Sequence, residues 1–176
     1  RLQSMPALIR ARSQGKRVVL IESCAADMDV YCDQTILIRP GTDGALALAM
    51  MHVMEEENLA DRDFLAHQTE GYEAFRKTLS PYTPAWAEKE TGIPAEVIAD
   101  LAKEYASAAA PAIILGSGPS RYGNGGMTTR LITILSAYTG AWGRRGGGLC
   151  GCNPGAGPYV DNRLVTRPDF RKKPGR

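Results

Sequence analysis

The sequence predicts an α/β fold, and three stretches of it carry that prediction. Residues 16–21 and 35–38 each contain a short, continuous apolar run, as the buried strands of parallel sheets do. The second run leads directly into a tight turn and a long apolar helix over residues 43–57. Residues 111–115 form a third apolar run, followed by a glycine-rich loop and another helix. Strands that alternate with helices in this way indicate a layered fold.

The chain before the second strand contains one helix and one strand. Residues 5–14 place apolar side chains at helical spacing and end near Gly15, a common C-cap residue. The strand of residues 16–21 is then closed by Glu22 and Ser23. An acidic residue at the end of such a strand can accept hydrogen bonds from a ribose, or it can simply be a polar residue at a sheet edge. The local sequence favours neither role.

The turn after the second strand is the segment Arg39-Pro40-Gly41-Thr42-Asp43. Pro40 and Gly41 suit a tight turn, and Thr42 and Asp43 are both residues that cap helix N-termini. Ligands of α/β folds bind at such junctions, between the carboxyl end of a strand and the amino end of a helix. A carboxylate here would repel a phosphate, but it can accept from two adjacent N–H donors, as on the Watson–Crick edge of guanine. Local chemistry alone favours the capping role for Asp43.

The helix over residues 43–57 is apolar on nearly all sides, so it should be buried within the layered fold. His52 lies in this apolar stretch, where a hydrogen-bonded core histidine is favoured over a catalytic one. Glu55 and the two glutamates after it should project into water, because acidic side chains oppose the dipole at a helix C-terminus. A structural region of short helices should follow, at residues 61–69, 71–79, 84–91 and 94–109.

The loop over residues 116–126 follows the third strand directly and is rich in glycine, which lets a backbone approach a bulky ligand closely. It does not match the Gly-x-Gly-x-x-Gly fingerprint of dinucleotide-binding folds. Arg121 stands where the third glycine is needed, and the next helix, residues 127–139, begins several residues too late. An NAD-dependent dehydrogenase is therefore not predicted. A flexible basic loop should occupy residues 141–149.

The composition is that of an ordinary globular protein, with 176 residues, 44% hydrophobic and 23% charged. No run approaches the roughly 18 apolar residues of a membrane span, and no signal peptide is visible. The chain begins at Arg1, within an α/β pattern, so we expect an internal fragment. Its C-terminal end is basic and nearly without aromatics, which favours a solvated end over a nucleic-acid arm. The basic residues of this end are Arg163, Arg167, Arg171, Lys172, Lys173 and Arg176.

The four cysteines do not have the spacing of a metal or redox site. Neither the pair Cys24 and Cys32 nor the pair Cys150 and Cys152 has the Cys-x-x-Cys pattern of zinc, iron–sulfur or thioredoxin sites. The Cys150-Gly151-Cys152 segment could ligate a metal or oxidise, but an incidental pair in a glycine-rich loop is favoured. The sequence therefore predicts no metal ligand.

Several motifs follow one another in an order that is more specific than any of them alone. They are GKRVVLIES, DQTILIRPGTDGALALAMMHVMEEENLADRDFL, TEGYEAF, YTPAWAEKETGIPAEVIADLAKEYASA, ILGSGPSRYGNGG and TRLITILSAYTGAWGRRGGGL. In this order, residues 5–150 resemble the molybdopterin oxidoreductase superfamily, whose enzymes carry a molybdenum or tungsten centre bound by two molybdopterin guanine dinucleotides. The formate dehydrogenase and polysulfide or thiosulfate reductase branches look nearest.

The resemblance implies a fold and a function. Residues 1–150 should form a Rossmann-like parallel-sheet sandwich with helices on both faces and a helical insertion, and residues 151–176 an irregular basic tail rich in glycine and proline. The α/β domain should hold the guanosine end of one pterin dinucleotide, for two-electron redox chemistry. The alternative is a truncated nucleotide-binding-like domain with no activity of its own.

The resemblance also implies a set of cofactor contacts in the turn and the two strand ends. In this interpretation Asp43 reads the guanine edge while it also caps its helix. Glu22 and Ser23 stand where the family usually has Asp-Pro. Arg144 and Arg145 lie in a loop that supplies a cation near the metal in some branches. The implied contacts are Glu22, Ser23, Arg39, Gly41, Thr42, Asp43, Gly116, Gly118, Ser120 and Asn124.

Other features of the family are not found in this chain. The side chain that ligates the metal, the cysteines of the iron–sulfur cluster and the domain for the second dinucleotide have no counterpart in residues 1–176. We therefore expect half of a cofactor site, with no catalytic residue and no activity for the chain alone. The expected partners are the remaining domains of the same enzyme and an iron–sulfur electron-transfer subunit, with no nucleic acid and no membrane insertion. The cellular compartment is not indicated.

Overall fold

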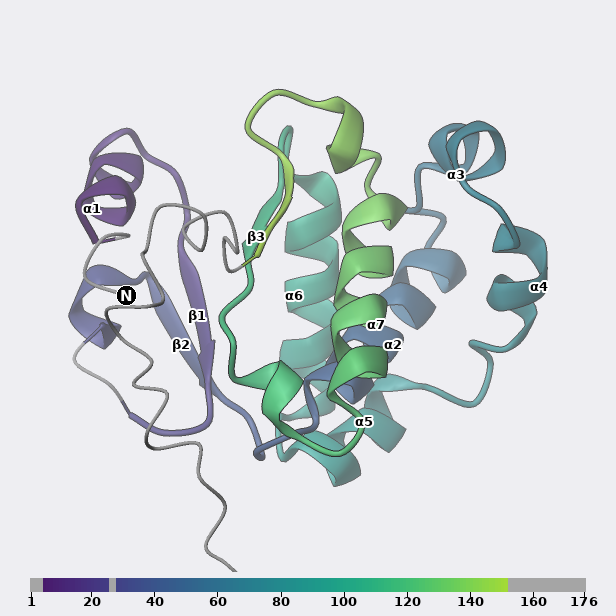
Figure 1. Cartoon of the computed structure of the whole chain (residues 1–176), viewed down its shortest axis with the longest axis horizontal. Helices are drawn as coiled ribbons and strands as arrows, with labels where there is room; N and C mark the ends of the chain where they lie inside the picture. The colour runs from purple at the N-terminus through teal and green to yellow at the C-terminus, as the bar shows by residue number, and fades with distance from the viewer. Residues whose placement is uncertain (1–4, 26–27, 152–176) are drawn as a thin grey trace, which may run out of the picture.

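The computed structural model describes residues 5–25 and 28–151, and it confirms the predicted α/β class (Figure 1). Within those residues it contains seven α-helices and four short strands. Figure 1 shows the strands between α1 (Met5–Ser13) on one side and the larger group of helices on the other. The predicted basic tail and Cys152 lie outside the described residues.

The strands pair in parallel, as the apolar runs predict, and form two small sheets in the described part of the chain. In the first, β1 (Val19–Glu22) pairs with β2 (Gln34–Leu37), with Ile21 opposite Ile36. In the second, β3 (Ala112–Ile114) pairs with β4 (Gly148–Cys150). The expectation of a loop throughout 141–149 is wrong for β4. Leu149 and Cys150 after three glycines are too short a signal, and the strand forms because β3 supplies its hydrogen-bonding partners.

The helices lie close to their predicted positions, because capping and turn residues mark most of their ends. Thr83 accepts a hydrogen bond from the Trp86 amide at the start of one helix, and Gly92 ends it with a positive φ of 78°. The helices are α2 (Asp43–Glu56), α3 (Arg62–Gln68), α4 (Tyr72–Lys77), α5 (Pro84–Thr91), α6 (Ala95–Ser107) and α7 (Gly125–Tyr138), with single turns η1 (Asp29–Tyr31), η2 (Pro119–Arg121) and η3 (Ala141–Gly143).

The core is organised around α2, which packs against α5, α6 and α7. Ala49, Met51 and Met54 of this helix are fully buried, as its apolar sequence predicts. His52 is half-buried, and its Nδ1 lies 3.1 Å from the Leu79 carbonyl oxygen, so this nitrogen carries the proton that it donates. The helix α2 is thus the centre of the fold. Its packing against α5, α6 and α7 fixes the position of its N-terminal end.

One expectation for the end of α2 is wrong. Glu55 does not project into water; its side chain is only 8% exposed. Its carboxylate accepts a hydrogen bond from the Tyr72 hydroxyl at 2.9 Å and lies 3.1 Å from Nε of Arg76. The short helix α4 brings both groups over the end of α2, so the unfavourable helix dipole is offset by a cation and a hydroxyl donor.

The length and apolar character of the helices show whether any of them could cross a membrane. Among the described residues, no helix is both long enough and apolar enough to cross a bilayer.

Candidate functional site

Two loops that the sequence analysis singles out meet at one end of the molecule. The first is the turn between β2 and α2, and the second is the loop between β3 and α7, both at the lower edge of Figure 1. The ring of Tyr122 lies against Gly41, so that a Cβ atom on this glycine would stand 3.0 Å from the ring. Three residues further on, a Cβ on Gly44 would stand 3.3 Å from the Thr128 hydroxyl. The N-terminal ends of α2 and α7 are therefore held side by side.

The turn between β2 and α2 has type II geometry, which explains its sequence. The Arg39 carbonyl accepts the Thr42 amide at 3.2 Å, with Pro40 and Gly41 in the central positions. Gly41 has a φ of 82°, the value that the third position of a type II turn requires. The Thr42 hydroxyl donates to the same carbonyl at 2.7 Å. The turn is thus closed twice, and both closures depend on residues within it.

Arg39 attaches this turn to a distant helix. Its Nη1 donates to the carbonyls of Lys89 at 2.8 Å and Glu90 at 2.7 Å, and its amide donates to the Thr91 carbonyl at 2.8 Å. These carbonyls belong to the last turn of α5, where helical carbonyls lack partners along the helix. Arg39 therefore fixes the position of the turn, while its predicted contact with a cofactor stays a prediction.

The predicted capping role of Asp43 is wrong. Thr42 occupies the N-cap position of α2 and makes no side-chain capping bond, because its hydroxyl is used within the turn. Asp43 is the first helical residue, and its carboxyl group interacts with its own backbone N–H. An acidic side chain in this first turn still benefits from the helix dipole. The carboxylate is therefore not committed to the backbone donors further along the helix.

Asp43 and Glu22 lie close together at the carboxyl ends of β1 and β2. Burial raises the pKa of Asp43, a hydrogen bond from its own backbone N–H lowers it, and the charge of Glu22 raises it. Glu22 is held in turn by its strand, since its carbonyl accepts the Ile38 amide at 2.9 Å and its Oε1 accepts the Ser23 amide at 3.2 Å. The pair forms a half-buried patch of acceptors, which a ligand with N–H donors would neutralise.

The loop between β3 and α7 contributes small and polar groups. Gly116 and Gly118 are exposed, with nothing within 4 Å of an added Cβ atom, so their backbone is open to a ligand. The Ser120 hydroxyl donates to the Ser117 carbonyl at 2.8 Å. Asn124 is exposed at the N-cap position of α7 and makes no side-chain capping bond. Its amide group is thus available beside a helix N-terminus.

The structure joins the predicted site residues in two groups. Glu22, Ser23 and the residues of the turn form one group at the ends of β1 and β2. Ser120 and Asn124 form the other, at the start of α7, and Tyr122 connects the two through Gly41. Tyr122 was missed by the sequence analysis. Its only signal is an aromatic residue within a loop of small residues.

The two arginines proposed from the resemblance lie elsewhere. Arg144 follows η3, near the C-terminal end of α7, which is about 20 Å from the N-terminal end of a 14-residue helix. Its Nη2 lies 3.2 Å from Oδ2 of Asp61, and its Nη1 donates to the Ala109 carbonyl at 3.1 Å. Arg145 is exposed nearby. Arg144 therefore ties α3 to the end of α6, and neither arginine belongs to the site at the N-terminus of α7.

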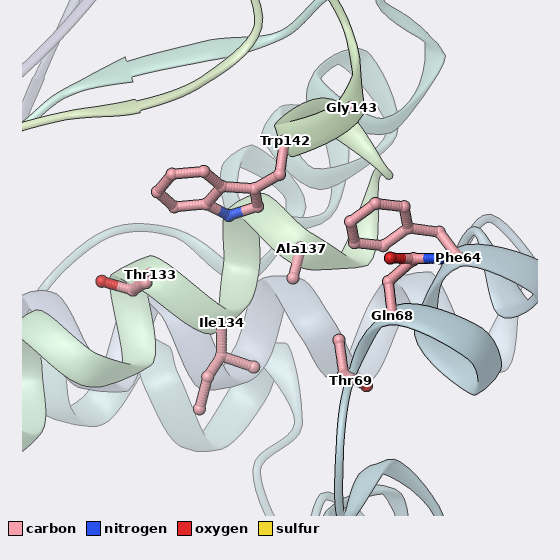
Figure 2. Close-up of a pocket in the computed structure, with 8 residues that line it drawn as sticks. All are labelled: Phe64, Gln68, Thr69, Thr133, Ile134, Ala137, Trp142 and Gly143. Atoms are coloured by element: carbon pink, nitrogen blue, oxygen red, sulfur yellow. The ribbon is translucent and has the colours of Figure 1, made fainter.

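A pocket of about 470 Å³ also lies away from this site (Figure 2). Figure 2 shows Trp142 and Phe64 facing each other across it, above Ala137 of α7. None of the ten predicted cofactor contacts lines it. In the described ranges, no group of three or more His, Cys, Asp or Glu side chains could hold a metal ion.

Comparison with known proteins now identifies the family of this arrangement. The family model for molybdopterin oxidoreductases matches residues 2–168. The chain is 40% identical to the probable oxidoreductase YoaE of Bacillus subtilis, over 93% of this chain and 24% of that protein. It is 35% identical to formate dehydrogenase H of Escherichia coli, over 94% of this chain and 25% of that protein. The chain therefore spans about a quarter of the length of these relatives.

A solved structure shows the same fold. The acetylene hydratase of Pelobacter acetylenicus superposes with a TM-score of 0.70 and 26% sequence identity. The match covers 75% of this chain and 18% of that one. A protein named as an acetylene hydratase thus shares the fold of this part of the chain.

Proposed function

This chain belongs to the molybdopterin oxidoreductase family, and we propose that it holds the guanosine end of one molybdopterin guanine dinucleotide in a molybdenum or tungsten oxidoreductase. The observation that carries the proposal is the half-buried pair of Asp43 and Glu22 beside the N-terminal ends of α2 and α7. Acceptors and helix N-termini at one place suit a ligand with N–H donors at one end and phosphates next to it.

The residues of the turn fit a guanine base. Guanine presents two adjacent N–H donors on its Watson–Crick edge, and a carboxylate can accept both. The Asp43 carboxyl group is in the first turn of α2 and has no capping role. N–H donors bound to it would offset the desolvation penalty of its charged form and the repulsion from Glu22. Glu22 and Ser23, at the end of β1, are then placed for the ribose.

The loop before α7 fits the phosphates and the pterin. Asn124 offers an amide donor next to the N-terminus of α7, whose dipole favours negative charge, and Ser120 lies in the same loop. Gly116 and Gly118 leave the backbone open to close approach. When bound, the cofactor supplies the two-electron redox chemistry, whereas the residues of this chain bind it and orient it.

The proposal extends to the rest of the enzyme. The described part of the chain has no cluster of metal ligands, and the relatives are about four times as long. We propose that the metal ligand, the second dinucleotide site and any iron–sulfur cluster belong to further domains of the same polypeptide, with an iron–sulfur subunit as electron partner. We propose that residues 1–150 act as the cofactor-binding domain.

The proposal is tested by analysis of the complete polypeptide that carries this chain, purified under anaerobic conditions. We expect molybdenum or tungsten together with guanine nucleotide released by acid treatment, two nucleotides for each metal ion if two dinucleotides are bound. Protein from cells grown without molybdate and tungstate is the control for adventitious metal. A protein that contains neither metal nor guanine nucleotide would leave the inactive, truncated domain as the correct interpretation.

A further inference from the structure

Tyr122 carries an inference that goes deeper into the proposed site. A Cβ atom on Gly41 would lie 3.0 Å from both Cγ and Cδ1 of this tyrosine and 3.4 Å from Cδ2. The contact is therefore made by the half of the ring nearest the backbone, and the hydroxyl group takes no part in it. The closeness is possible only because residue 41 has no side chain, and its φ of 82° requires glycine independently.

Each partner of this contact is fixed to a different part of the core. Gly41 lies in the doubly closed turn that Arg39 attaches to α5. The carbonyl of Tyr122 accepts the Gly125 amide at 2.9 Å, and a Cβ on Gly125 would lie 2.6 Å from the Ser120 carbonyl oxygen. The segment from Ser120 to Gly125 is thus packed tightly onto the start of α7. The ring of Tyr122 therefore adds a contact between the turn and the loop, next to the packing of Gly44 against Thr128.

The ring is not part of the hydrophobic core. Tyr122 is 45% exposed and has no place among the buried residues around α2. An aromatic ring has only two side-chain torsions, so it makes a stiff spacer at little cost in conformational entropy. Its position beside Gly41 therefore matters more for the relation between the two loops than for the stability of the fold.

We infer that Tyr122 is a positioning residue of the cofactor site. Its ring sets the separation between the turn that bears Asp43 and the loop that bears Ser120 and Asn124. A ligand held by both loops binds best when their separation is correct before it arrives, because no binding energy is then used to order them. The inference rests on the proposed function and names a determinant of affinity that the cofactor contacts alone do not include.

The test uses the complete polypeptide and measures how fast it loses metal and guanine nucleotide in dilute, mildly denaturing buffer. We expect Tyr122→Ala to lose the cofactor about tenfold faster, as supporting residues of bound groups do when removed. Tyr122→Phe should match the natural protein, because it keeps Cγ, Cδ1 and Cδ2. Met127→Ala is the control, since Met127 lies in the next segment with a similar exposure of 47%.

The thermal unfolding of the cofactor-free proteins separates positioning from general stability. We expect the midpoints of Tyr122→Ala and Met127→Ala to be equal within error, because both changes remove an exposed apolar side chain. A clearly lower midpoint for Tyr122→Ala, matching its loss of cofactor, would overturn the positioning role. So would a Tyr122→Phe variant that loses cofactor as fast as Tyr122→Ala, because the hydroxyl group would then be the important part.

The outcomes distinguish this inference from the proposed function. If Asp43→Asn releases the cofactor while Tyr122→Ala retains it, the positioning role is wrong and the proposed function stands. If the natural protein contains neither metal nor guanine nucleotide, the proposed function fails, and the inference fails with it.

Discussion

The side chain of Asp43 lies in surroundings that disfavour its charged form. Its carboxyl group is half-buried next to Glu22, and it does not cap its helix. Nothing in the stability of the fold requires a carboxylate here, because Thr42 and Arg39 already close the turn. Groups whose pKa is perturbed by burial and by a like charge are frequent at functional sites, where the ligand removes the penalty.

The first prediction concerns cofactor binding by Asp43. Asp43→Asn keeps the shape of the side chain but replaces one acceptor oxygen by a donor, so it should clash with the N–H donors of guanine. We expect the complete enzyme to contain several-fold less metal and guanine nucleotide, since an unpaired buried polar group costs about 1–3 kcal/mol. Asp63→Asn is the control, because the Asp63 side chain is 92% exposed on α3. Equal cofactor content in both variants would assign Asp43 to folding alone.

The second prediction concerns the pH dependence of the cofactor-free protein. Because burial raises the pKa of Asp43 in the fold, ionisation destabilises the folded state as pH rises from the unfolded-state pKa, about 4, through the higher folded value. The penalty is complete above the folded pKa and absent below the unfolded one. Asp43→Asn should therefore be more stable than the natural protein near neutral pH, and the difference should shrink on acidification.

Urea unfolding at a series of pH values measures this difference. The charge of Glu22 contributes to the raised pKa of Asp43, so Glu22→Gln should make the difference between the natural protein and Asp43→Asn smaller. A difference in unfolding free energy that does not change between neutral and acidic pH would show that the buried charge is not its cause.

At the scale of elements, the site depends on how α7 begins. Its first residue, Gly125, packs against the backbone of Ser120 in η2. The second residue, Gly126, has nothing within 4 Å of an added Cβ atom. Two adjacent glycines in the same helical turn thus have different reasons to be there. Gly125 allows η2 to pack against the start of α7. This packing places Tyr122 next to the turn between β2 and α2.

The third prediction compares these glycines. Gly125→Ala would place a Cβ 2.6 Å from the Ser120 carbonyl oxygen, so η2 must move. We expect a loss of about 1–3 kcal/mol in unfolding free energy, together with a lower cofactor content. Gly126→Ala should instead raise the unfolding free energy by about 0.5–1 kcal/mol, because alanine is the better helix former. Denaturant unfolding and metal analysis of both variants check the pair; equal losses would contradict it.

For the molecule as a whole, the described strands leave apolar side chains in the open. Leu37 of β2 is 56% exposed and Ile114 of β3 is 62% exposed, each close to the site. Parallel sheets are normally covered on both faces, and sheets of two strands are seldom stable by themselves. The further domains that we propose from relatives about four times as long would cover these faces.

The fourth prediction follows from these exposed faces. The 176-residue chain produced alone should contain no metal and have no redox activity, and it should self-associate through its apolar strands. Leu37→Thr with Ile114→Thr should reduce that self-association, measured by light scattering, and Val97→Thr on α6 offers a comparison within the packed part of the chain. An isolated chain that is monomeric and retains bound metal would contradict the prediction.

The sequence by itself determined those features that depend on neighbouring residues. Pro40 and Gly41 dictate a type II turn, and Thr83 and Gly92 mark the start and end of α5, because these conformations arise within a few residues. The order of the motifs also sufficed to identify the family. Pattern and turn chemistry are local, so the class of the fold and most helix positions could be predicted without coordinates.

Only the tertiary structure decided which distant groups meet. Arg39 binds carbonyls of α5 that lie 50 and 51 positions along the chain, and Arg144 pairs with an aspartate 83 positions away. The strand β4 exists because β3 lies beside it. Tyr122 is part of the candidate site because its ring lies against Gly41. Such contacts are set by the packing of whole elements around α2. The type of a residue does not indicate which distant residue it will contact.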